Sequence, residues 1–385
     1  PIAYGNVART IWVDDVLGDD VIGSGSELYP YASPKKALFE AWHGDVINMR
    51  SGIYAGGVFV RRSNITIQSA PGHWAVIAGS THEPSSVVNA VSVGHDVSNL
   101  IMRNFEITGG FYYGIMLSTS GGMAAHNTLL ENLRVHRTGS VCIKASMGTT
   151  DLMIRSSEIS HCGTRYFKNA HAIAGIQTHH LTVEDCYIHD LGGGAGVHLE
   201  AGSIHTLLQR NYISNVTFGM NIGFAAAYGS FDVSTNPELY ESIDSTIVNN
   251  IITGTRMAAI NLWAAHSARI VFNTLFHVQE YAQSAVIING FQHNDAPGAP
   301  HTSCKNITIV GNIITKSSSA SGTNGGGYGS AMLHIRDYGL VGSDMPHMSH
   351  NIYHAEAGWE SQSVATFLDE RTITDDPSSV FFGDL

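Results

Sequence analysis

Charged side chains are scarce in this sequence. Asp, Glu, Lys and Arg together make up only 14% of the 385 residues, and only six residues are lysine. The formal net charge is −12 at pH 7, and no basic stripe runs along the chain. Because a nucleic-acid binder neutralises phosphates with Lys and Arg, this pattern argues against a nucleic-acid partner. A polyanionic substrate is only disfavoured, since local groups or a bound cation can reverse the field at one place.

Long apolar runs and paired cysteine motifs are also missing. No apolar run approaches the roughly 20 residues of a membrane-spanning helix, and the first residues lack signal-peptide architecture. We therefore expect a soluble chain without a membrane span. The four cysteines, Cys142, Cys162, Cys186 and Cys304, have no CxxC spacing, which argues against zinc and leaves a disulfide between two of them open. No GxSxG elbow supports serine-nucleophile chemistry.

What the sequence does contain is a repeated phrase, a β-rich apolar pair followed by Asn-x-Ile or a near relative. Glycine is abundant, at 41 residues, and separates the copies together with Asn and Ser. From Ser157 onward, successive copies are separated by 29, 25, 39, 23, 39 and 39 residues, by subtraction of their numbers. The basic unit is therefore about 23 to 29 residues, and three units carry insertions. The copies begin at Ser157, Cys186, Asn211, Asn250, Asn273, Asn312 and Asn351, and looser copies begin at Asn104 and Asn132.

Short alternating strands at this period are what a coil of parallel strands requires, because each coil buries its inward side chains against its neighbours. The repeated asparagine tolerates left-handed turn geometry and can hydrogen-bond its equivalent one coil away. We interpret the chain as an all-β, single-domain right-handed parallel β-helix with long loop insertions. A propeller is the alternative, but it needs four strands in 40 to 50 residues and a blade signature that is absent.

The N-terminal region predicts a capping helix. Ser33, Pro34 and Gly44 stand where the N-cap, the first position and the C-terminal stop of a helix belong. Such a helix would cover the open first coil and protect its strand edge from pairing with another molecule. We expect three regions: a strand and capping helix over 1–50, the β-helix over 51–355, and a C-terminal cap or tail over 356–385.

Together, the opening segment and the repeats to about Tyr353 resemble the pectate-lyase-like β-helix superfamily. The phrase GVHLEAGSIHTLLQRNYISN followed by GMNIGF is similar to polysaccharide lyases related to chondroitinase B and alginate lyases. The resemblance implies a polysaccharide substrate and a secreted, periplasmic or cell-surface location. It also implies calcium as one way to hold a substrate carboxylate. The chain lacks the Glu-x-Glu pair of chondroitinase B, so the metal stays unassigned.

Strand alternation predicts one outward-facing row of polar side chains. If Val197 and Leu199 point inward, His198 and Glu200 emerge on the outer face. The same alternation one coil later, and in the coils around it, places a further set of side chains outside. Since stacked coils lie about 4.8 Å apart, these side chains are expected to form one patch. The set is Cys142, Lys144, Asn221, Asn261 and Trp263.

Insertions next to these strands are expected to form binding walls. The loop 163–171 carries Arg165, Tyr166, Lys168 and His171, and the insertion 223–242 carries Tyr228, Phe231 and Tyr240. Later insertions follow at 290–301 and 317–330. Together these segments would border a groove suited to an extended chain, with Arg165, Tyr166, Lys168 and Tyr228 as substrate-binding residues.

The favoured function is a polysaccharide lyase that cleaves a uronic-acid-containing glycan by β-elimination. This chemistry needs a group that neutralises the uronate carboxylate and a base that removes the neighbouring proton. Asn221, Asn261 and Glu200 would hold the carboxylate directly or through a cation, and Lys144 or His198 would be the base.

Two other functions remain open. A glycoside hydrolase would pair Glu200 with Asp232 or Asp190, and a non-catalytic β-helix would only bind glycan. Several polar residues have structural interpretations. His136, His189 and Asp190 fit turns, Cys186 fits a packing position, and a metal role for His179 and His180 is less favoured than a turn.

Overall fold

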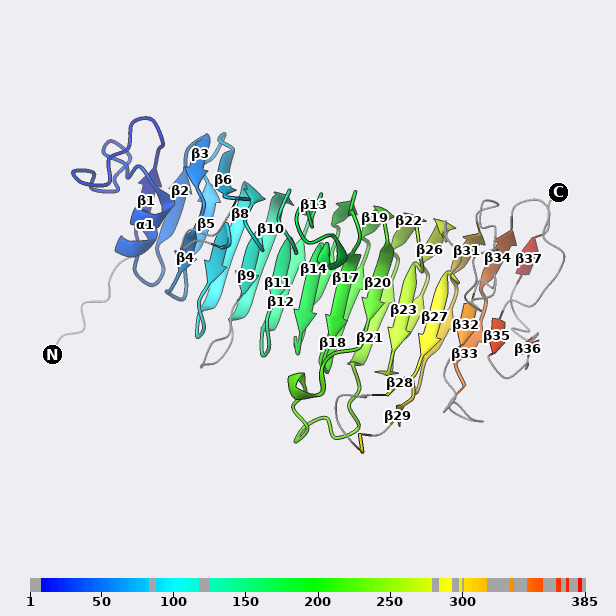
Figure 1. Ribbon diagram of the computed structural model, residues 1–385. Helices are drawn as coiled ribbons and strands as arrows, with labels where there is room; N and C mark the ends of the chain where they lie inside the picture. Colours follow the sequence, from blue (N-terminus) through cyan, green and yellow to red (C-terminus); the bar gives the residue numbers. More distant parts are fainter. Residues whose placement is uncertain are drawn as a thin grey trace. The chain divides into compact units, whose positions relative to one another are not determined.

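The computed structural model describes residues 8–82, 88–117, 125–278, 284–292, 298–299, 301–316, 333–335, 345–355, 365–367, 372–373 and 380–382. The chain divides into two compact units, Pro1–Ala170 and His171–Leu385. Both are built from short parallel β-strands, each stacked on the strand of the neighbouring coil (Figure 1). The predicted parallel β-helix is therefore confirmed. The insertion at 317–330 lies outside the described residues.

The first unit contains thirteen strands among its described residues. One series of parallel strands runs in the order β4, β7, β9 and β11. In the rest of the unit, β1 pairs with β2, β2 with β5 and β3 with β6, and both β5 and β6 pair with the long strand β8. Strand β8 pairs with β10, and β10 pairs with β12 and β13. The strands are β1 (Thr10–Val13), β2 (Val46–Met49), β3 (Gly52–Ala55), β4 (Val58–Val60), β5 (Thr66–Ser69), β6 (Ala75–Gly79), β7 (Val91–Val93), β8 (Ser98–Gly109), β9 (Ile115–Leu117), β10 (His126–His136), β11 (Ile143–Ala145), β12 (Thr150–Arg155) and β13 (Glu158–Ser160).

The second unit repeats three parallel series coil after coil. The first is β14 (Ile173–Ile176), β17 (Ala195–Glu200), β20 (Phe218–Ile222), β23 (Ile260–Trp263), β27 (Val286–Asn289), β32 (Leu333–Ile335) and β35 (Ala365–Phe367). The second is β15 (Thr182–Glu184), β18 (Ser203–Gln209), β21 (Ser242–Val248), β24 (Ala265–His266), β25 (Arg269–Val271), β30 (Thr308–Val310) and β33 (His347–Ser349). The third is β16 (Tyr187–His189), β19 (Tyr212–Val216), β22 (Ile251–Thr255), β26 (Thr274–Val278), β31 (Ile313–Lys316), β34 (Ile352–Ala355) and β37 (Val380–Phe382).

Three short strands complete the second unit. β28 (Phe291–Gln292) and β29 (His301–Thr302) form an antiparallel pair at the insertion 290–301, and β36 (Thr372–Ile373) pairs antiparallel with β35. The insertions that begin at Gly223 and Gly290 follow the ends of β20 and β27, and these two strands still pair in parallel with β23 and β32 of the next coil.

Inward-pointing aliphatic side chains form the core of each coil. Val197 and Leu199 of β17 are fully buried, as are Met220 and Ile222 of β20. Val197 pairs with Met220 and Leu199 with Ile222, so apolar side chains stack in register from one coil to the next. Each such side chain contributes about 1.5–3 kcal/mol when fully buried. Because the side-chain period of a strand is two, this burial also fixes which residues face outward.

The repeated asparagines of the second unit form a hydrogen-bonded ladder inside the fold. Asn250 Nδ2 donates to Asn273 Oδ1 at 3.0 Å and to the Leu208 carbonyl at 2.9 Å. Its own Oδ1 accepts from the backbone and side-chain nitrogens of Asn211, at 3.0 and 2.9 Å. The same bonds continue through Asn312 to Asn351. The predicted side-chain bond to the equivalent residue one coil away is confirmed.

The left-handed backbone conformation falls one position before the ladder. Arg210 and Asn249 have φ of 55°, and Phe272 has φ of 56°, whereas the ladder asparagines that follow them are not in this region. The asparagine is thus required for its side-chain amide, and the turn itself is made by the preceding residue. In the first unit, Asn104 and Asn132 do adopt positive φ, and their side chains bond each other on the surface at 2.9 Å.

The capping helix is α1 (Pro34–Glu40), and it packs on β1, β2 and β4. Ser33 Oγ accepts from the Lys36 backbone N–H, and Pro34 occupies the first turn, as predicted. The helix ends earlier than expected, because Ala41 is already extended, with ψ of 147°. Gly44, the predicted stop, instead makes a later turn with φ of 93°. Ala37 and Leu38 are buried on the coil that the helix covers.

Replacing a ladder asparagine should destabilise the protein strongly. Asn250→Ala leaves the backbone N–H of Asn211 and the carbonyl of Leu208 without their amide partners inside the fold. We expect the free energy of unfolding to fall by about 3 kcal/mol, measured as a lower midpoint in thermal and urea denaturation. The control is Asn169→Ala at an exposed position. Equal midpoints for the two variants would contradict the structural role of the ladder.

Candidate functional site

The outward side chains of β17, β20 and β23 form a continuous polar row. His198 is paired in register with Asn221, and Asn221 with Asn261, so the coil spacing brings the three together. Figure 1 shows β17, β20 and β23 side by side, and Glu200 and Trp263 are the last residues of β17 and β23. We call these five residues, His198, Glu200, Asn221, Asn261 and Trp263, the His198 row.

Hydrogen bonds connect the His198 row in one direction. Trp263 Nε1 donates to Asn261 Oδ1 at 2.9 Å, and Asn261 Nδ2 donates to Asn221 Oδ1 at 3.4 Å. Asn221 Nδ2 lies 3.5 Å from His198 Nδ1, and His198 Nε2 lies 3.4 Å from Glu200 Oε2. With neutral His198 protonated on Nε2, each of the four contacts joins a donor to an acceptor, and the chain ends at the Glu200 carboxylate.

Two rings, His171 and Phe224, contact the row, and its three central members are buried although their side chains leave the strands on the outer face. His171 stacks on His198 with ring centroids 4.1 Å apart, and Phe224 lies 5.4 Å from His198 and 5.1 Å from Trp263. As a result His198 is only 6% exposed, and Asn221 and Asn261 are buried as well. Glu200 and Trp263 are partly exposed.

His171 has a defined protonation pattern. Its Nδ1 accepts a hydrogen bond from the Ala195 backbone N–H at 3.1 Å. The proton of the neutral ring is therefore on Nε2, which makes His171 a hydrogen-bond donor rather than a base. The sequence predicts that His171 belongs to a loop that borders the groove, but strand alternation does not predict that its ring stacks on His198.

Phe224 is the first side chain of the insertion 223–242, and the geometry of Gly223 directs it over the row. Gly223 has φ of 88°, and a Cβ added there would lie 2.1 Å from the Trp263 carbonyl oxygen. Only glycine fits this position. The insertion continues through Tyr228 in a 3-10 turn, Tyr228–Ser230, where Tyr228 is exposed. Phe231 and Leu239 pack with Ala201 and Ala226 in a small buried cluster beneath it.

Glu241 holds the start of this insertion in place, and sequence reasoning missed it. Its side chain is fully buried, and its two oxygens accept from the backbone N–H groups of Ala201 and Ala226, each at 2.8 Å. The Phe224 N–H also bonds this carboxyl group. The pKa of Glu241 is raised to about 7, mainly by burial and to a smaller extent by the neighbouring Glu200, while the hydrogen bonds from the backbone N–H groups act in the opposite direction. No spacing rule in the sequence marks this position.

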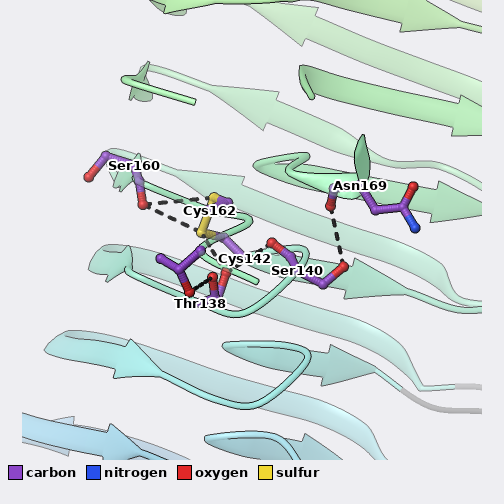
Figure 2. The surroundings of a disulfide bond; sticks show 7 residues. Thr138, Ser140, Cys142, Ser160, Cys162 and Asn169 are labelled. Carbon is purple, nitrogen blue, oxygen red and sulfur yellow. Dashed lines mark hydrogen bonds between the residues drawn. A yellow bond between two sulfur atoms is a disulfide. The ribbon is translucent and has the colours of Figure 1, made fainter. Parts of the chain in front are cut away.

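The remaining predicted residues lie in the first unit. Lys144 is the outward residue of β11, in register with Met116 of β9, and is partly buried. Arg165, Tyr166 and Lys168 are exposed on the loop that follows β13, Lys168 within the 3-10 turn Phe167–Asn169. Cys142, expected outside with Lys144, is instead fully buried because it forms a disulfide with Cys162 (Figure 2).

The prediction that His136 and His189 form turns is wrong, because they are the last residues of β10 and β16 and the left-handed corners fall on the next residues, Arg137 and Asp190. His136 Nε2 lies 2.9 Å from Glu106 Oε1, and His189 Nδ1 lies 2.7 Å from Asp190 Oδ2, with Asp190 at a left-handed corner. Cys186 is buried in the ladder position, and its backbone N–H donates to Asn211 Oδ1. Among the described residues, no group of three or more His, Cys, Asp or Glu side chains could hold a metal ion, the surroundings of His179 and His180 included.

Protonation of Glu241 should link stability to pH. Its pKa is raised in the folded protein, so between about pH 4.5 and 7 the folded state binds more protons than the unfolded state, and stability falls as pH rises. This contribution amounts to at most about 3 kcal/mol. In Glu241→Gln it is absent, so the melting temperature of the wild type relative to this variant should drop by several degrees across the window.

A matched control for this measurement is Asp232→Asn in the same insertion. Asp232 is exposed, and hydrogen bonds from Ser234 lower its pKa. Its contribution to stability therefore changes with pH only below the ordinary pKa of an aspartate. The melting temperature of Asp232→Asn relative to wild type should stay constant between pH 4.5 and 7. A parallel pH dependence in wild type and Glu241→Gln would contradict the assignment to Glu241.

Comparisons with known proteins identify the fold. The family described as "Right handed beta helix region" matches residues 51–237. No curated protein matches the sequence. No helix within the described ranges is long and apolar enough to cross a membrane.

Solved structures match over nearly the whole chain at low identity. An alginate lyase from Paenibacillus sp. str. FPU-7 is 13% identical, with 97% of both chains covered and a TM-score of 0.50. The A-module of the Azotobacter vinelandii mannuronan C-5 epimerase AlgE6 is 14% identical, with 91% of this chain and 92% of that one covered and a TM-score of 0.57. A GH136 lacto-N-biosidase from Eubacterium ramulus is 12% identical, with 98% and 67% covered and a TM-score of 0.55. The chain therefore has the fold of the right-handed parallel β-helix proteins.

Proposed function

We propose that the protein is a polysaccharide lyase that cleaves a uronic-acid-containing glycan by β-elimination at the His198 row. The observation that carries this proposal is the one-directional hydrogen-bond chain from Trp263 to Glu200 through two amides and an imidazole. Solved structures with this fold include an alginate lyase and a mannuronan epimerase, which supports an acidic glycan as the substrate class.

β-Elimination on a uronate places two demands on a site. A base removes the proton on the carbon next to the carboxylate, and that electron pair forms a double bond as the bond from the neighbouring carbon to the glycosidic oxygen breaks. The departing oxygen takes a proton from water, and the base later releases its own proton to the solvent, so the products are an unsaturated uronate and a new chain end. Hydrogen bonds to the carboxylate make the proton more acidic by stabilising the charge that develops there.

His198 is the proposed base. In the tautomer described above its Nδ1 carries the lone pair, and the 3.5 Å contact with Asn221 Nδ2 is long enough to exchange for a substrate. When Nδ1 takes the proton, the imidazolium lies beside the Glu200 carboxylate, whose Oε2 is 3.4 Å from Nε2. Glu200 thus orients the ring and stabilises its charged form, as a carboxylate does beside a catalytic histidine.

Asn221 and Asn261 are the proposed carboxylate-binding groups. Their amides lie one coil apart beside His198, and each presents an Nδ2 donor that now makes only a long contact. Trp263 is partly exposed at the end of the row and offers a ring face for a sugar. Since Phe224 covers His198, a sugar reaches Nδ1 only when Phe224 moves aside.

The residues of the row do not fit calcium. Calcium takes six to eight oxygen ligands, whereas the row contributes one carboxylate, Glu200, which faces His198. The Asn261 oxygen already accepts from Trp263, and the Asn221 oxygen from Asn261. The proposed elimination therefore relies on amide donors.

A glycoside hydrolase is the weaker candidate, because it needs two carboxyl groups that reach the sugar. Glu241 interacts electrostatically with Glu200, but it is fully buried and its oxygens face backbone N–H groups. Asp190 is bound to His189 and Asn215 at a corner of the third series, and Asp232 accepts from Ser234 within the insertion.

An absorbance assay tests the proposed function. The protein is incubated with polygalacturonate, alginate and chondroitin, and the ultraviolet band of the unsaturated uronate is recorded together with reducing ends. A lyase raises both signals. His198→Ala and Glu200→Ala should each lower kcat by about 100-fold or more, and Asn221→Ala should mainly lower kcat/KM. The Lys144→Ala variant tests the alternative base.

The matched control is His205→Ala. His205 is also paired with a carboxylate, Asp244 at 2.6 Å, but it is exposed at another corner. Its turnover should equal that of wild type. Reducing ends without the ultraviolet band would indicate a hydrolase, and unchanged turnover in His198→Ala would remove the proposed site.

A further inference from the structure

A cluster of aromatic rings in the first unit has no role in the His198 row. Tyr112 and Tyr166 stack with ring centroids 5.4 Å apart and an interplanar angle of 19°. Both are exposed, at 36% and 39%. Beneath them lies the buried ring of Phe111, edge-to-face with Tyr112 at 4.8 Å. We call Phe111, Tyr112, Arg165 and Tyr166 the Tyr166 platform.

Arg165 gives the Tyr166 platform a positive charge. Its guanidinium carbon lies 4.1 Å from the centre of the Phe111 ring, and its Nη1 donates to the Thr81 carbonyl at 2.8 Å. The Phe111 ring and the Thr81 carbonyl carry no negative charge, so they do not neutralise the guanidinium. Within the described ranges, no carboxylate forms an ion pair with Arg165, and the segment 163–170 contains no acidic residue. The charge also acts on the Tyr112 hydroxyl, where it opposes the rise in pKa caused by the hydrogen bond with Tyr166.

The backbone around the platform is fastened at several points. The Gly139 carbonyl accepts from the backbone N–H groups of Arg165 and Tyr166, at 3.0 and 2.8 Å. The disulfide Cys142–Cys162 fixes the start of the loop, and Ser140 Oγ donates to the Asn169 carbonyl at its end, at 3.3 Å (Figure 2). A rigid display of rings and a guanidinium loses little entropy when a ligand binds.

A comparison within the chain shows what distinguishes the platform. Tyr187 and Tyr212 in the second unit are also exposed and have ring centroids 5.4 Å apart. The guanidinium of Arg210, two residues before Tyr212, is bonded to Asp185 and Glu184. That pair offers ring surface without an available cation, whereas the Tyr166 platform offers both.

We propose that the Tyr166 platform binds an acidic sugar residue of a glycan, with the sugar carboxylate on Arg165 and the sugar ring against Tyr166 and Tyr112. A planar guanidinium matches a carboxylate with two parallel hydrogen bonds, and aromatic faces pack on the C–H face of a sugar. The inference rests on the proposed function for the substrate class, and it assigns a second place on the chain that holds the polymer without cleaving it.

The test is a binding measurement that does not depend on turnover. All variants are made in the His198→Ala background, and dissociation constants for polygalacturonate and its methyl ester are measured by affinity electrophoresis. Arg165→Gln should weaken binding of polygalacturonate about tenfold and leave the ester unaffected. Arg165→Lys should recover only part of the loss, since an ammonium lacks the planar fork. Tyr166→Ala should weaken binding of both polymers severalfold.

Two variants serve as matched controls. Arg62→Gln removes a guanidinium that lies 4.6 Å over the Trp42 ring in the same unit, and Tyr212→Ala removes one ring of the other exposed tyrosine pair. Neither should change binding. Equal weakening by Arg62→Gln and Arg165→Gln would mean general charge attraction and would overturn the proposal. Melting temperatures of all variants within one degree of the background exclude misfolding as the cause.

The outcome separates this inference from the proposed function. Lost binding in Arg165→Gln supports the platform whether or not the wild type produces an unsaturated uronate. If the wild type cleaves the polymer but no variant of the platform changes binding, the platform proposal is overturned and the proposed lyase function stands. Equally tight, Arg165-dependent binding of dextran sulfate would show a general anion site and would overturn the carboxylate assignment.

Discussion

The in-register stacking of parallel strands is the constraint on which the rest of the structure depends. Each inward Val, Ile, Leu or Met packs on its counterpart one coil away, and a shift by one residue would move every buried side chain to the surface. The register therefore has essentially one solution. It also decides the outer face, where His198, Asn221 and Asn261 become neighbours although 23 and 40 residues separate them in sequence.

Buried polar groups on this scaffold fall into two kinds, which differ in hydrogen-bond length. The side chains of the ladder asparagines bond each other at 2.9 to 3.0 Å and backbone carbonyls at 2.9 to 3.2 Å, within the normal range for N–H···O bonds. Within the His198 row, three of the four contacts are 3.4 to 3.5 Å long. Short bonds stabilise the fold. Long contacts between buried polar groups cost stability that a ligand can restore, which is why we place chemistry at the row and not at the ladder.

Much of this arrangement follows from the sequence. The alternation around Val197 and Leu199, repeated at Met220 and Ile222, predicts the outward faces of β17 and β20. The spacing of the asparagines predicts the ladder. These features are local and periodic, and burial of aliphatic side chains enforces them. The same rule is wrong for Cys142, because the disulfide with Cys162 and the loop above it bury an outward position.

The features that the sequence does not predict lie in loops and insertions, which do not follow the repeat. Phe224 covers His198 because the chain turns at Gly223. Glu241 is held under the insertion by hydrogen bonds that its carboxyl group accepts from three backbone N–H groups. Helix α1 ends at Glu40 because Ala41 already has an extended backbone, three residues before Gly44. Tertiary contacts of insertions decide each of these, and no spacing rule encodes them.

The most direct measurement is a crystal structure of the His198→Asn variant with a bound uronate oligosaccharide. The account predicts a uronate carboxylate within hydrogen-bond distance of the Asn221 and Asn261 amides, with the carbon next to it facing residue 198 and Phe224 displaced. An oligosaccharide bound elsewhere, with Phe224 still over an unoccupied row, would contradict it.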